Sequence, residues 1–131
     1  MDQLIVPISA GELFDKISIL MIKAERISDP PKLAHVRAEL ELLQAIASEH
    51  FPSASPELEG LLAQLKSVNE AIWEAENIVR ECDRLRRFDD IFVSTARSTY
   101  QNNDRRAALK REINVLLESP IVEVKSHAND V

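Results

Sequence analysis

Apolar residues recur at spacings of three and four through the middle of the chain. The positions that follow this spacing are Leu58, Leu61, Leu65, Val68, Ile72, Ala75, Val79 and Cys82. Such a repeat is typical of one long helix packed along a single seam. Ser55 and Pro56 supply an N-cap and a first-turn proline, so we predict a helix from residue 56 to about Leu85.

Two further helices are predicted before this long one. Ser9 and Glu12 have the spacing of a capping box, which starts a helix that ends near Ile27. An apolar stripe covers most of its circumference, which predicts that this helix lies at the centre of the fold. Asp29, followed by two prolines, starts a second helix that ends before Phe51. We expect the second and third helices to form an antiparallel hairpin.

The last third of the chain predicts two shorter helices, over about residues 89–100 and 104–118, separated by the polar residues 101–103. Residues 4–8 and 121–125 are β-like runs, and we expect them to pair as a two-strand clasp. The predicted fold class is therefore all-α, a bundle of about five helices with a long third helix.

Composition supports one compact helical domain over residues 1–131. The chain has two glycines and 5% aromatic residues, too few for a sandwich or barrel. No apolar run is long enough to span a membrane and the first residues lack a signal-peptide pattern, which predicts a cytoplasmic protein. The single cysteine, Cys82, falls in the apolar seam and excludes an internal disulfide and a thiolate zinc site.

Charge is distributed unevenly along the chain. The net charge is −6, but residues 80–111 contain nine Lys or Arg against five acids, so this segment carries +4. Arg105 and Arg106 fall in the first turn of the predicted last helix, where an anion is favourable. The simpler alternative is that these arginines pair with the acidic remainder. The low isoelectric point and the absence of interleaved aromatics argue against nucleic acid.

Polar side chains line one edge of three predicted helices, at about 100° of rotation per residue. The edges comprise Glu12, Lys16, Lys23 and Arg26 on the first helix, Asn69, Trp73, Glu76, Arg80 and Asp83 on the third, and Asn103, Arg106, Lys110 and Asn114 on the last. Convergence of these edges would create one polar pocket. The alternative is that Trp73 belongs to the core and that Glu76 and Arg80 form a surface i,i+4 pair.

These residues also carry a resemblance that covers most of the chain. Its first half comprises Gly11-Glu12-Leu13, Asp15-Lys16, Ile19-Leu20, Ile22-Lys23, Arg26-Ile27, Val68-Asn69, Trp73, Glu76 and Arg80. Its second half comprises Ala96-Arg97, Tyr100, Asn103-Asp104, Arg106, Lys110, Ile113-Asn114 and Val122-Glu123-Val124-Lys125-Ser126. The chain resembles a bacterial domain family of unknown function that occurs in surface-polysaccharide and glycosyltransferase proteins. The resemblance implies a setting rather than a reaction, and His127 departs from the aromatic residue expected after the serine.

Enzyme chemistry finds little support in the spacing of reactive residues. The three histidines match neither a Glu-x-x-His di-iron pattern nor zinc spacing, and no glycine-rich loop is present, so we predict no metal and no cofactor. Glu12 with Asp15, or Glu76, would act as an acid or base only if burial raised a pKa. An enzyme of unknown reaction therefore stays an alternative, with no catalytic residue assigned.

The favoured function is a binding domain for an anionic ligand such as a sugar phosphate or nucleotide sugar. Arg97, Tyr100 and Asp104 join the polar-edge residues as candidate ligand contacts, because arginine and lysine suit phosphate and an aromatic face suits a sugar ring or base. The alternative is a non-catalytic adaptor or dimerisation module that docks to a biosynthetic enzyme. A homodimer is favoured, because a helix of about 30 residues outreaches shorter neighbours.

Overall fold

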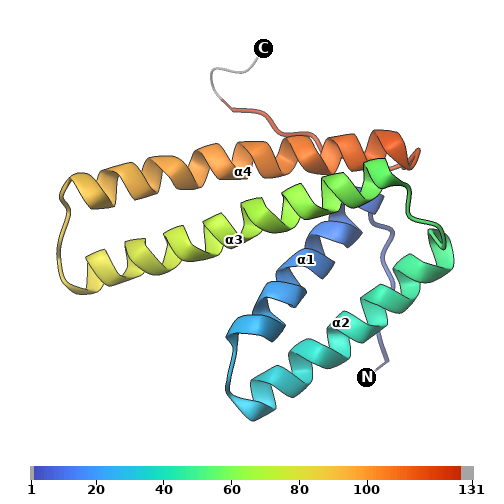
Figure 1. Cartoon of the computed structure of the whole chain (residues 1–131), viewed down its shortest axis with the longest axis horizontal. Coiled ribbons are helices and arrows are strands. Elements are labelled where there is room, and N and C mark those ends of the chain that lie inside the picture. Colours follow the sequence, from blue (N-terminus) through green and yellow to red (C-terminus); the bar gives the residue numbers. More distant parts are fainter. Residues whose placement is uncertain (1, 128–131) are drawn as a thin grey trace.

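The computed structural model describes residues 2–127, which contain four helices (Figure 1). The helices are α1 (Ala10–Arg26), α2 (Pro30–His50), α3 (Pro56–Arg84) and α4 (Asp90–Leu116). They form two antiparallel hairpins, α1–α2 and α3–α4 (Figure 1). The predicted all-α class and the long third helix are confirmed.

The helix starts follow from their capping residues. The side chains of Ser9, Asp29 and Ser55 each accept a hydrogen bond from the amide three residues later, at 3.1 to 3.2 Å. Asp89 caps α4 in the same way, through the amide of Phe92 at 3.3 Å. Each bond satisfies an amide that the helix itself leaves unpaired. The predicted starts of the first three helices are confirmed.

The last third of the chain is one helix instead of two. Residues 101–103 were expected to form a turn, yet they continue the helix within α4. Asn102 and Asn103 are half-buried there, and α4 packs along α3. Packing along a long partner outweighs the weak helix propensity of asparagine. The expectation of an anion at a helix start near Arg106 is therefore wrong, because Arg106 lies in mid-helix.

The expected two-strand clasp is also absent, since residues 2–127 contain no strand. Residues 3–8 lie beside α2 and the turn after α4, whereas residues 123–127 lie along α4. The two segments therefore lie beside different helices, and neither has a neighbouring strand with which to form backbone hydrogen bonds. Leu4 and Ile5 are almost fully exposed, as expected for an apolar run without a sheet to cover it.

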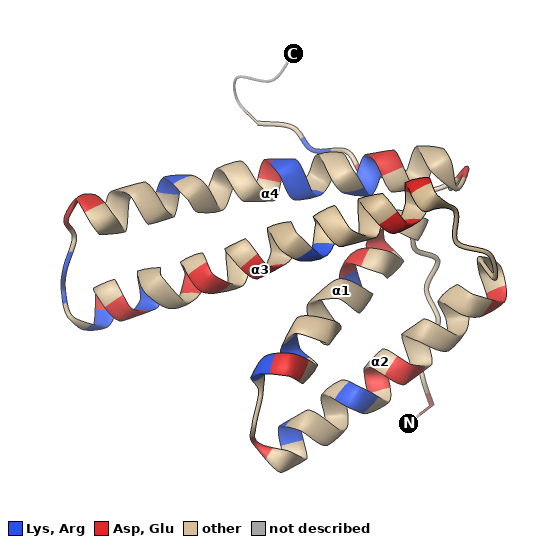
Figure 2. Ribbon diagram, in the orientation of Figure 1, with Lys and Arg blue, Asp and Glu red and all other residues tan. Residues whose placement is uncertain are grey.

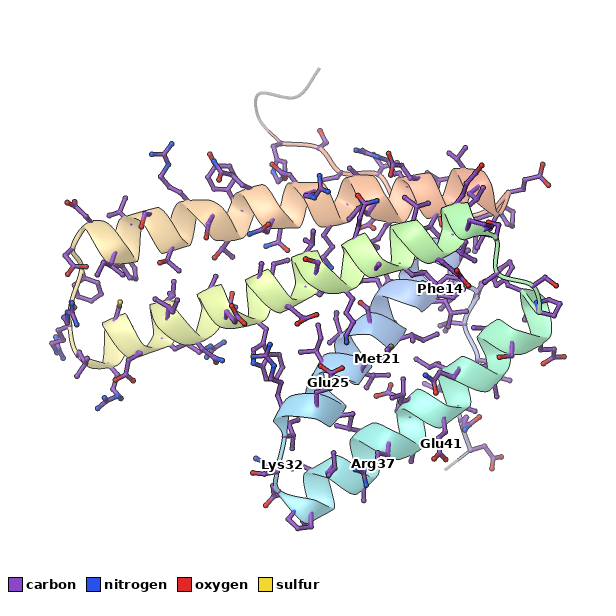
Figure 3. The ribbon with its side chains drawn as sticks, viewed as in Figure 1. Phe14, Met21, Glu25, Lys32, Arg37 and Glu41 are labelled. Atoms are coloured by element: carbon purple, nitrogen blue, oxygen red, sulfur yellow. The ribbon has the colours of Figure 1, made fainter. Side chains whose placement is uncertain are left out.

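α1 is the central helix, as predicted, because it packs against each of the other three. In the described chain α2 packs only against α1, so the expected α2–α3 hairpin is wrong. Leu40, Leu43 and Ala47 of α2 join the core of α1. Phe14 contacts Phe51 there, with ring centroids 5.7 Å apart. Figure 3 shows Phe14 and Met21 on the side of α1 toward α2. The apolar side chains of α2 therefore pack on α1, where we had expected them to pack on α3.

The hydrophobic core lies at one end of the α3–α4 hairpin. It takes residues of α3 only up to Ile72 and residues of α4 only from Leu109. Residues 73–100, which we call the arm, extend beyond α1 and α2 (Figure 1). The predicted burial of Cys82 inside this arm is confirmed. No helix in the described residues is long and apolar enough to cross a membrane.

Candidate functional site

Asp15 of α1 is the centre of a buried polar junction between three helices. Its side chain is 1% exposed and accepts two hydrogen bonds from the Arg106 guanidinium of α4, one of them from Nε at 2.9 Å. Asn69 of α3 donates from Nδ2 to Asp15 Oδ1 at 2.9 Å. A carboxylate of α1 thus joins α3 and α4.

Ser18 completes this junction on the next turn of α1. Its hydroxyl donates to the backbone carbonyl of Asp15 at 2.8 Å and accepts from Asn69 Nδ2 at 2.7 Å. Asn69 therefore donates to both residues of α1. Burying a carboxylate is costly unless it is paired and hydrogen-bonded, and these partners meet that requirement. Because both Asp15 oxygens already accept bonds, the carboxylate acts as a brace between helices and is not available to a substrate.

Electrostatics at Arg106 agree with this arrangement. The hydrogen bonds from Arg106 to Asp15 raise the pKa of the guanidinium above its ordinary value, although burial acts in the opposite direction. The pair is bidentate, which fixes the plane of the guanidinium as well as its position. Arg106 is therefore held in one orientation before any ligand arrives.

A second contact of α1 with α4 requires glycine. The amide of Gly11 donates to Asn114 Oδ1 at 2.7 Å. A Cβ on Gly11 would lie 2.4 Å from the carbonyl oxygen of Lys110. Only a residue without a side chain permits this approach, because that carbonyl belongs to the backbone of a packed helix. Gly11 thus sets how closely the start of α1 approaches α4.

Lys110 lies beside this contact and binds two carboxylates. Its Nζ is 2.7 Å from Glu12 of α1 and 2.7 Å from Glu123, which follows α4. Burial lowers the pKa of Lys110 and is the largest single influence. The hydrogen bonds to Glu12 and Glu123, with the negative charges of Glu12 and Asp15, together outweigh it, so the pKa is raised overall. Lys110 is therefore a buried cation that joins α1 to the segment after α4.

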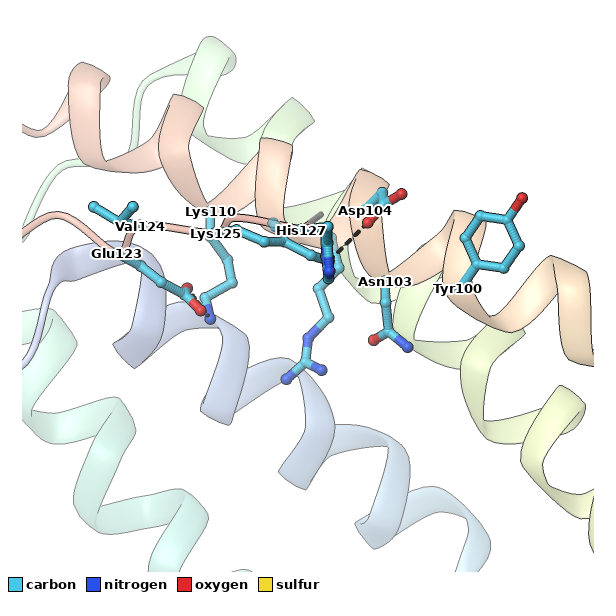
Figure 4. Close-up of a pocket in the computed structure, with 10 residues that line it drawn as sticks. Tyr100, Asn103, Asp104, Lys110, Glu123, Val124, Lys125 and His127 are labelled. Carbon is cyan, nitrogen blue, oxygen red and sulfur yellow. Dashed lines mark ion pairs between the residues drawn. The ribbon is translucent and has the colours of Figure 1, made fainter. Parts of the chain in front are cut away.

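Residues 121–127, which we call the strap, run back along α4. Glu123 fixes the strap to Lys110, and Lys125 pairs with Asp104 at 2.8 Å (Figure 4). The hydrogen bond from Lys125 lowers the pKa of Asp104. The strap thus supplies the anion to one ion pair and the cation to the other. These two pairs with α4 hold a segment that has no secondary structure of its own.

A pocket of about 830 Å³ lies between α4 and the strap (Figure 4). It is lined by five residues that the sequence indicated: Tyr100, Asn103, Asp104, Arg106 and Lys110. The strap adds Glu123, Lys125 and His127. The pocket wall therefore carries three Lys or Arg side chains and two carboxylates. Among the described residues, no group of three His, Cys, Asp or Glu side chains is placed to hold a metal ion.

Five predicted residues join α1 to α3 and α4, at the Asp15 junction or in the contact beside it: Glu12, Asn69, Arg106, Lys110 and Asn114. Tyr100, Asn103 and Asp104 line the pocket, and the remaining predicted residues lie apart from both. Lys16 is half-exposed, 3.9 Å from Glu12, and Lys23 is half-buried on α1. Trp73 is half-buried, Glu76 and Arg80 form an exposed pair at 3.5 Å, and Arg97 is exposed. The three polar edges thus meet at their ends nearest the core and separate along the arm.

Asp15 and Ser18 are junction residues that the sequence pattern did not indicate. Asp15 was considered as an acid or base and in the resemblance, although a carboxylate next to Phe14 on a largely apolar helix is a signal for a buried ion pair. Glu123 and Lys125 appeared only in the resemblance. Their position on an irregular segment gave no helical periodicity by which to place them.

The fold and site define a small all-helical domain, in which a buried ion pair joins three helices beside a charged pocket. The chain belongs to the family described as a family of unknown function, DUF6165, whose model matches residues 4–131. Comparison of the chain with curated proteins and with solved structures gives no match.

Proposed function

We propose that this domain binds a small anionic ligand in the pocket between α4 and the strap. The observation that carries the proposal is the convergence of Arg106, Lys110 and Lys125 on one pocket of about 830 Å³. This volume lies within the range of small-molecule sites. Lysine and arginine side chains are the usual protein partners of phosphate and carboxylate.

The cations retain donors that their protein partners do not use. A guanidinium has five N–H groups, and Asp15 takes one from Nε and one from Nη2 of Arg106. An ammonium has three N–H groups, and Glu12 and Glu123 each accept from Lys110. The remaining donors are available to ligand oxygens. Because Asp15 already fixes Arg106, a ligand would lose little affinity to side-chain ordering.

The proposed ligand class is a sugar phosphate or nucleotide sugar. Tyr100 lies in the pocket wall with 55% of its surface exposed, so its ring offers a face to a sugar or a base. The sugar part of this proposal also draws on the resemblance to bacterial surface-polysaccharide proteins. An anionic group would occupy the end of the pocket near Arg106 and Lys110, and the ring would lie toward Tyr100.

Glu123 is the internal competitor for such a ligand. Its carboxylate already binds Lys110 at 2.7 Å, so an anion that approaches Lys110 would replace it or meet repulsion from it. Removal of this charge should therefore strengthen binding. This expectation distinguishes an anion site from a set of ion pairs whose only role is to hold the strap in place.

Thermal unfolding with nucleotide sugars, sugar phosphates and inorganic phosphate tests the proposal. A ligand at about 100 times its Kd adds about 2.7 kcal/mol of stability, which raises Tm by several degrees. Lys125→Ala should reduce the shift and Glu123→Gln should increase it. Arg111→Ala is the matched control, because Arg111 adjoins Lys110 on α4 but lies outside this pocket. An equal shift in all variants, or none with any ligand, would contradict the proposal.

An adaptor role is the second candidate, and one observation favours it. The arm extends beyond every helix that would cover it, and carries exposed apolar residues near its tip, including Leu85, Phe88 and Ile91. Small proteins rarely leave such residues together without a partner. The surface involved is identified below.

A further inference from the structure

The α3–α4 hairpin has one covered side and one bare side. α1 covers the side that carries Asn69 of α3. Gly60 and Ile78 each lie nine residues from Asn69, which is two and a half helical turns, so both point away from α1. Leu85 lies two further turns along the same line. We call this side of the hairpin the bare face.

Exposure confirms that nothing in the described chain covers this face. Ile78 and Leu85 are 44% and 46% exposed, and Val115 of α4 is 79% exposed. At the end near the core the bare face contains an open groove of about 870 Å³, lined by Gly60 of α3 and Ala108 of α4 among others. Gly60 and Ala108, with the exposed Val115 beside them, lie near the core, and the exposed Ile78 and Leu85 lie toward the tip of the same surface.

We propose that the bare face binds a second copy of this chain, with the two hairpins antiparallel. The face is long enough for a stable interface. α3 has 29 residues, so the hairpin measures about 43 Å by about 20 Å, and covers on the order of 800 Å² per chain. The resulting dimer is a four-helix bundle in which the tip of each arm lies over the base of the other.

Side-chain size is complementary in this arrangement. When two copies of α3 run in opposite directions with Leu85 of one opposite Gly60 of the other, residues 61–84 of the two helices overlap. Ile78 then lies opposite Ser67. A Cβ at Gly60 would meet nothing within 4 Å in the single chain, so space is available for the incoming leucine. The large residues of each tip therefore face the small residues of the other base.

Charge is complementary in the same alignment. α3 begins with Glu57 and Glu59 in its first turn, whereas the loop after it carries Arg86 and Arg87 (Figure 2). The register that sets Leu85 opposite Gly60 also sets the basic loop of one copy over the acidic start of the other. Within residues 2–127 no ion pair is formed by Glu57, Glu59 or Arg86. Their charges are therefore available to a partner that has the same distribution, which favours self-association over an unrelated protein.

Sedimentation velocity from about 1 to about 100 µM protein tests the interface. The wild-type chain should form a dimer, and Ile78→Glu with Leu85→Glu should weaken dimerisation at least about tenfold. Leu42→Glu is the matched control, because Leu42 is 43% exposed on α2, away from the bare face. Circular dichroism checks that each variant keeps its helices. A monomeric wild-type chain, or a dimer that survives both glutamates, would overturn the proposal.

A charge reversal tests the antiparallel alignment. Glu57→Arg alone and Arg86→Glu alone should each weaken dimerisation by about threefold to tenfold, because Glu57 lines the groove of the bare face. The variant with both changes should recover the wild-type dissociation constant, because the two sites exchange signs across the interface. Recovery is a property of paired copies and would not follow from loss of folding. If the double variant is weaker than either single one, the antiparallel alignment is wrong.

Discussion

Single atoms decide how α1 meets α4. The Lys110 carbonyl leaves no room for a Cβ on Gly11, so Gly11→Ala must separate the two helices. We expect a loss of about 2–4 kcal/mol in the free energy of unfolding, as for other overpacked sites where a rigid group cannot move. The measurement is urea unfolding followed by circular dichroism.

Gly60→Ala is the control for this substitution. Gly60 also lies in a helix, but an added Cβ meets nothing within 4 Å of the single chain. In dilute protein we expect stability to stay the same or to rise by about 0.5–1 kcal/mol, because alanine favours the helix. If Gly11→Ala and Gly60→Ala destabilised the fold equally, the close contact with Lys110 would not be the cause. The backbone of α4 would then move aside at Lys110 without cost.

The buried carboxylate is the second decisive residue. Asp15→Asn keeps the size of the side chain but leaves the Arg106 guanidinium without its counter-charge. We expect a loss of about 3–5 kcal/mol in unfolding free energy. Glu25→Gln breaks a comparable pair with Lys66, at 2.6 Å on the surface, and should cost less than about 1 kcal/mol. Similar losses in both variants, measured by urea unfolding, would exclude the proposed brace.

Sequence reasoning reached part of this site because polar edges of helices can be counted. Asn69, Arg106 and Lys110 were indicated by their rotation about the helix axis, and they do lie where α1, α3 and α4 meet. Asp15 was considered with Glu12 as an acid or base and was not assigned to a polar edge, yet it is fully buried and paired with Arg106. Periodicity reports which side of a helix a residue occupies, but not which other helix will face it.

At the scale of elements, the two longest helices end in the same way without glycine. Arg86 and Glu118 each have a positive φ, 54° and 53°. After α3, the amide of Arg87 donates to the carbonyl of Cys82 at 2.8 Å, the long bond of a Schellman motif. A left-handed conformation costs an L-residue about 1 kcal/mol that glycine avoids.

Arg86→Gly should therefore stabilise the fold by up to about 1 kcal/mol. The expected readout is a higher midpoint of urea unfolding in dilute protein with an unchanged slope. Arg84→Gly, two residues earlier and within α3, is the control and should destabilise by a similar amount. A lower unfolding midpoint for Arg86→Gly would contradict this expectation. It would mean that the Arg86 side chain stabilises the fold by more than its backbone strain destabilises it.

Element boundaries show where sequence reasoning stops. Caps at Ser9, Asp29 and Ser55 are local chemistry, so the starts of three helices were predictable. Residues 101–103 look like a turn in isolation, and only the presence of α3 along their whole length keeps them helical. The prediction of a two-strand clasp was wrong for a similar reason. A strand is stable only beside a pairing strand, and the sequence pattern does not show which segments will lie side by side.

At the scale of the whole molecule, cations buried with two carboxylates make stability depend on pH. The pKa of Lys110 is raised in the folded chain above its ordinary value of 10.5. The ion pairs therefore contribute fully below about pH 10.5, and their contribution declines as pH rises through the folded pKa. We expect wild type to exceed Lys110→Gln in unfolding free energy by about 1–3 kcal/mol at pH 8.

Urea unfolding from pH 8 to pH 11.5 checks this. The difference between wild type and Lys110→Gln should be constant at first and shrink only at the alkaline end. Arg111→Ala, an exposed neighbour on α4, should show no such change in its difference from wild type. A difference that stays constant to pH 11.5 would mean that Lys110 does not titrate in this range.

The span of the Asp15–Arg106 pair also has a consequence during protein synthesis. The two residues are separated by 91 positions, and the amide partner of Gly11 lies 103 positions downstream. At about 5–20 residues per second, Asp15 waits roughly 5–18 s for its arginine to be made. The nascent α1–α2 hairpin must spend that time with a hydrated carboxylate on the side of α1 that later meets α3 and α4. Early docking of α1 is thereby opposed until the ribosome has delivered nearly the whole chain.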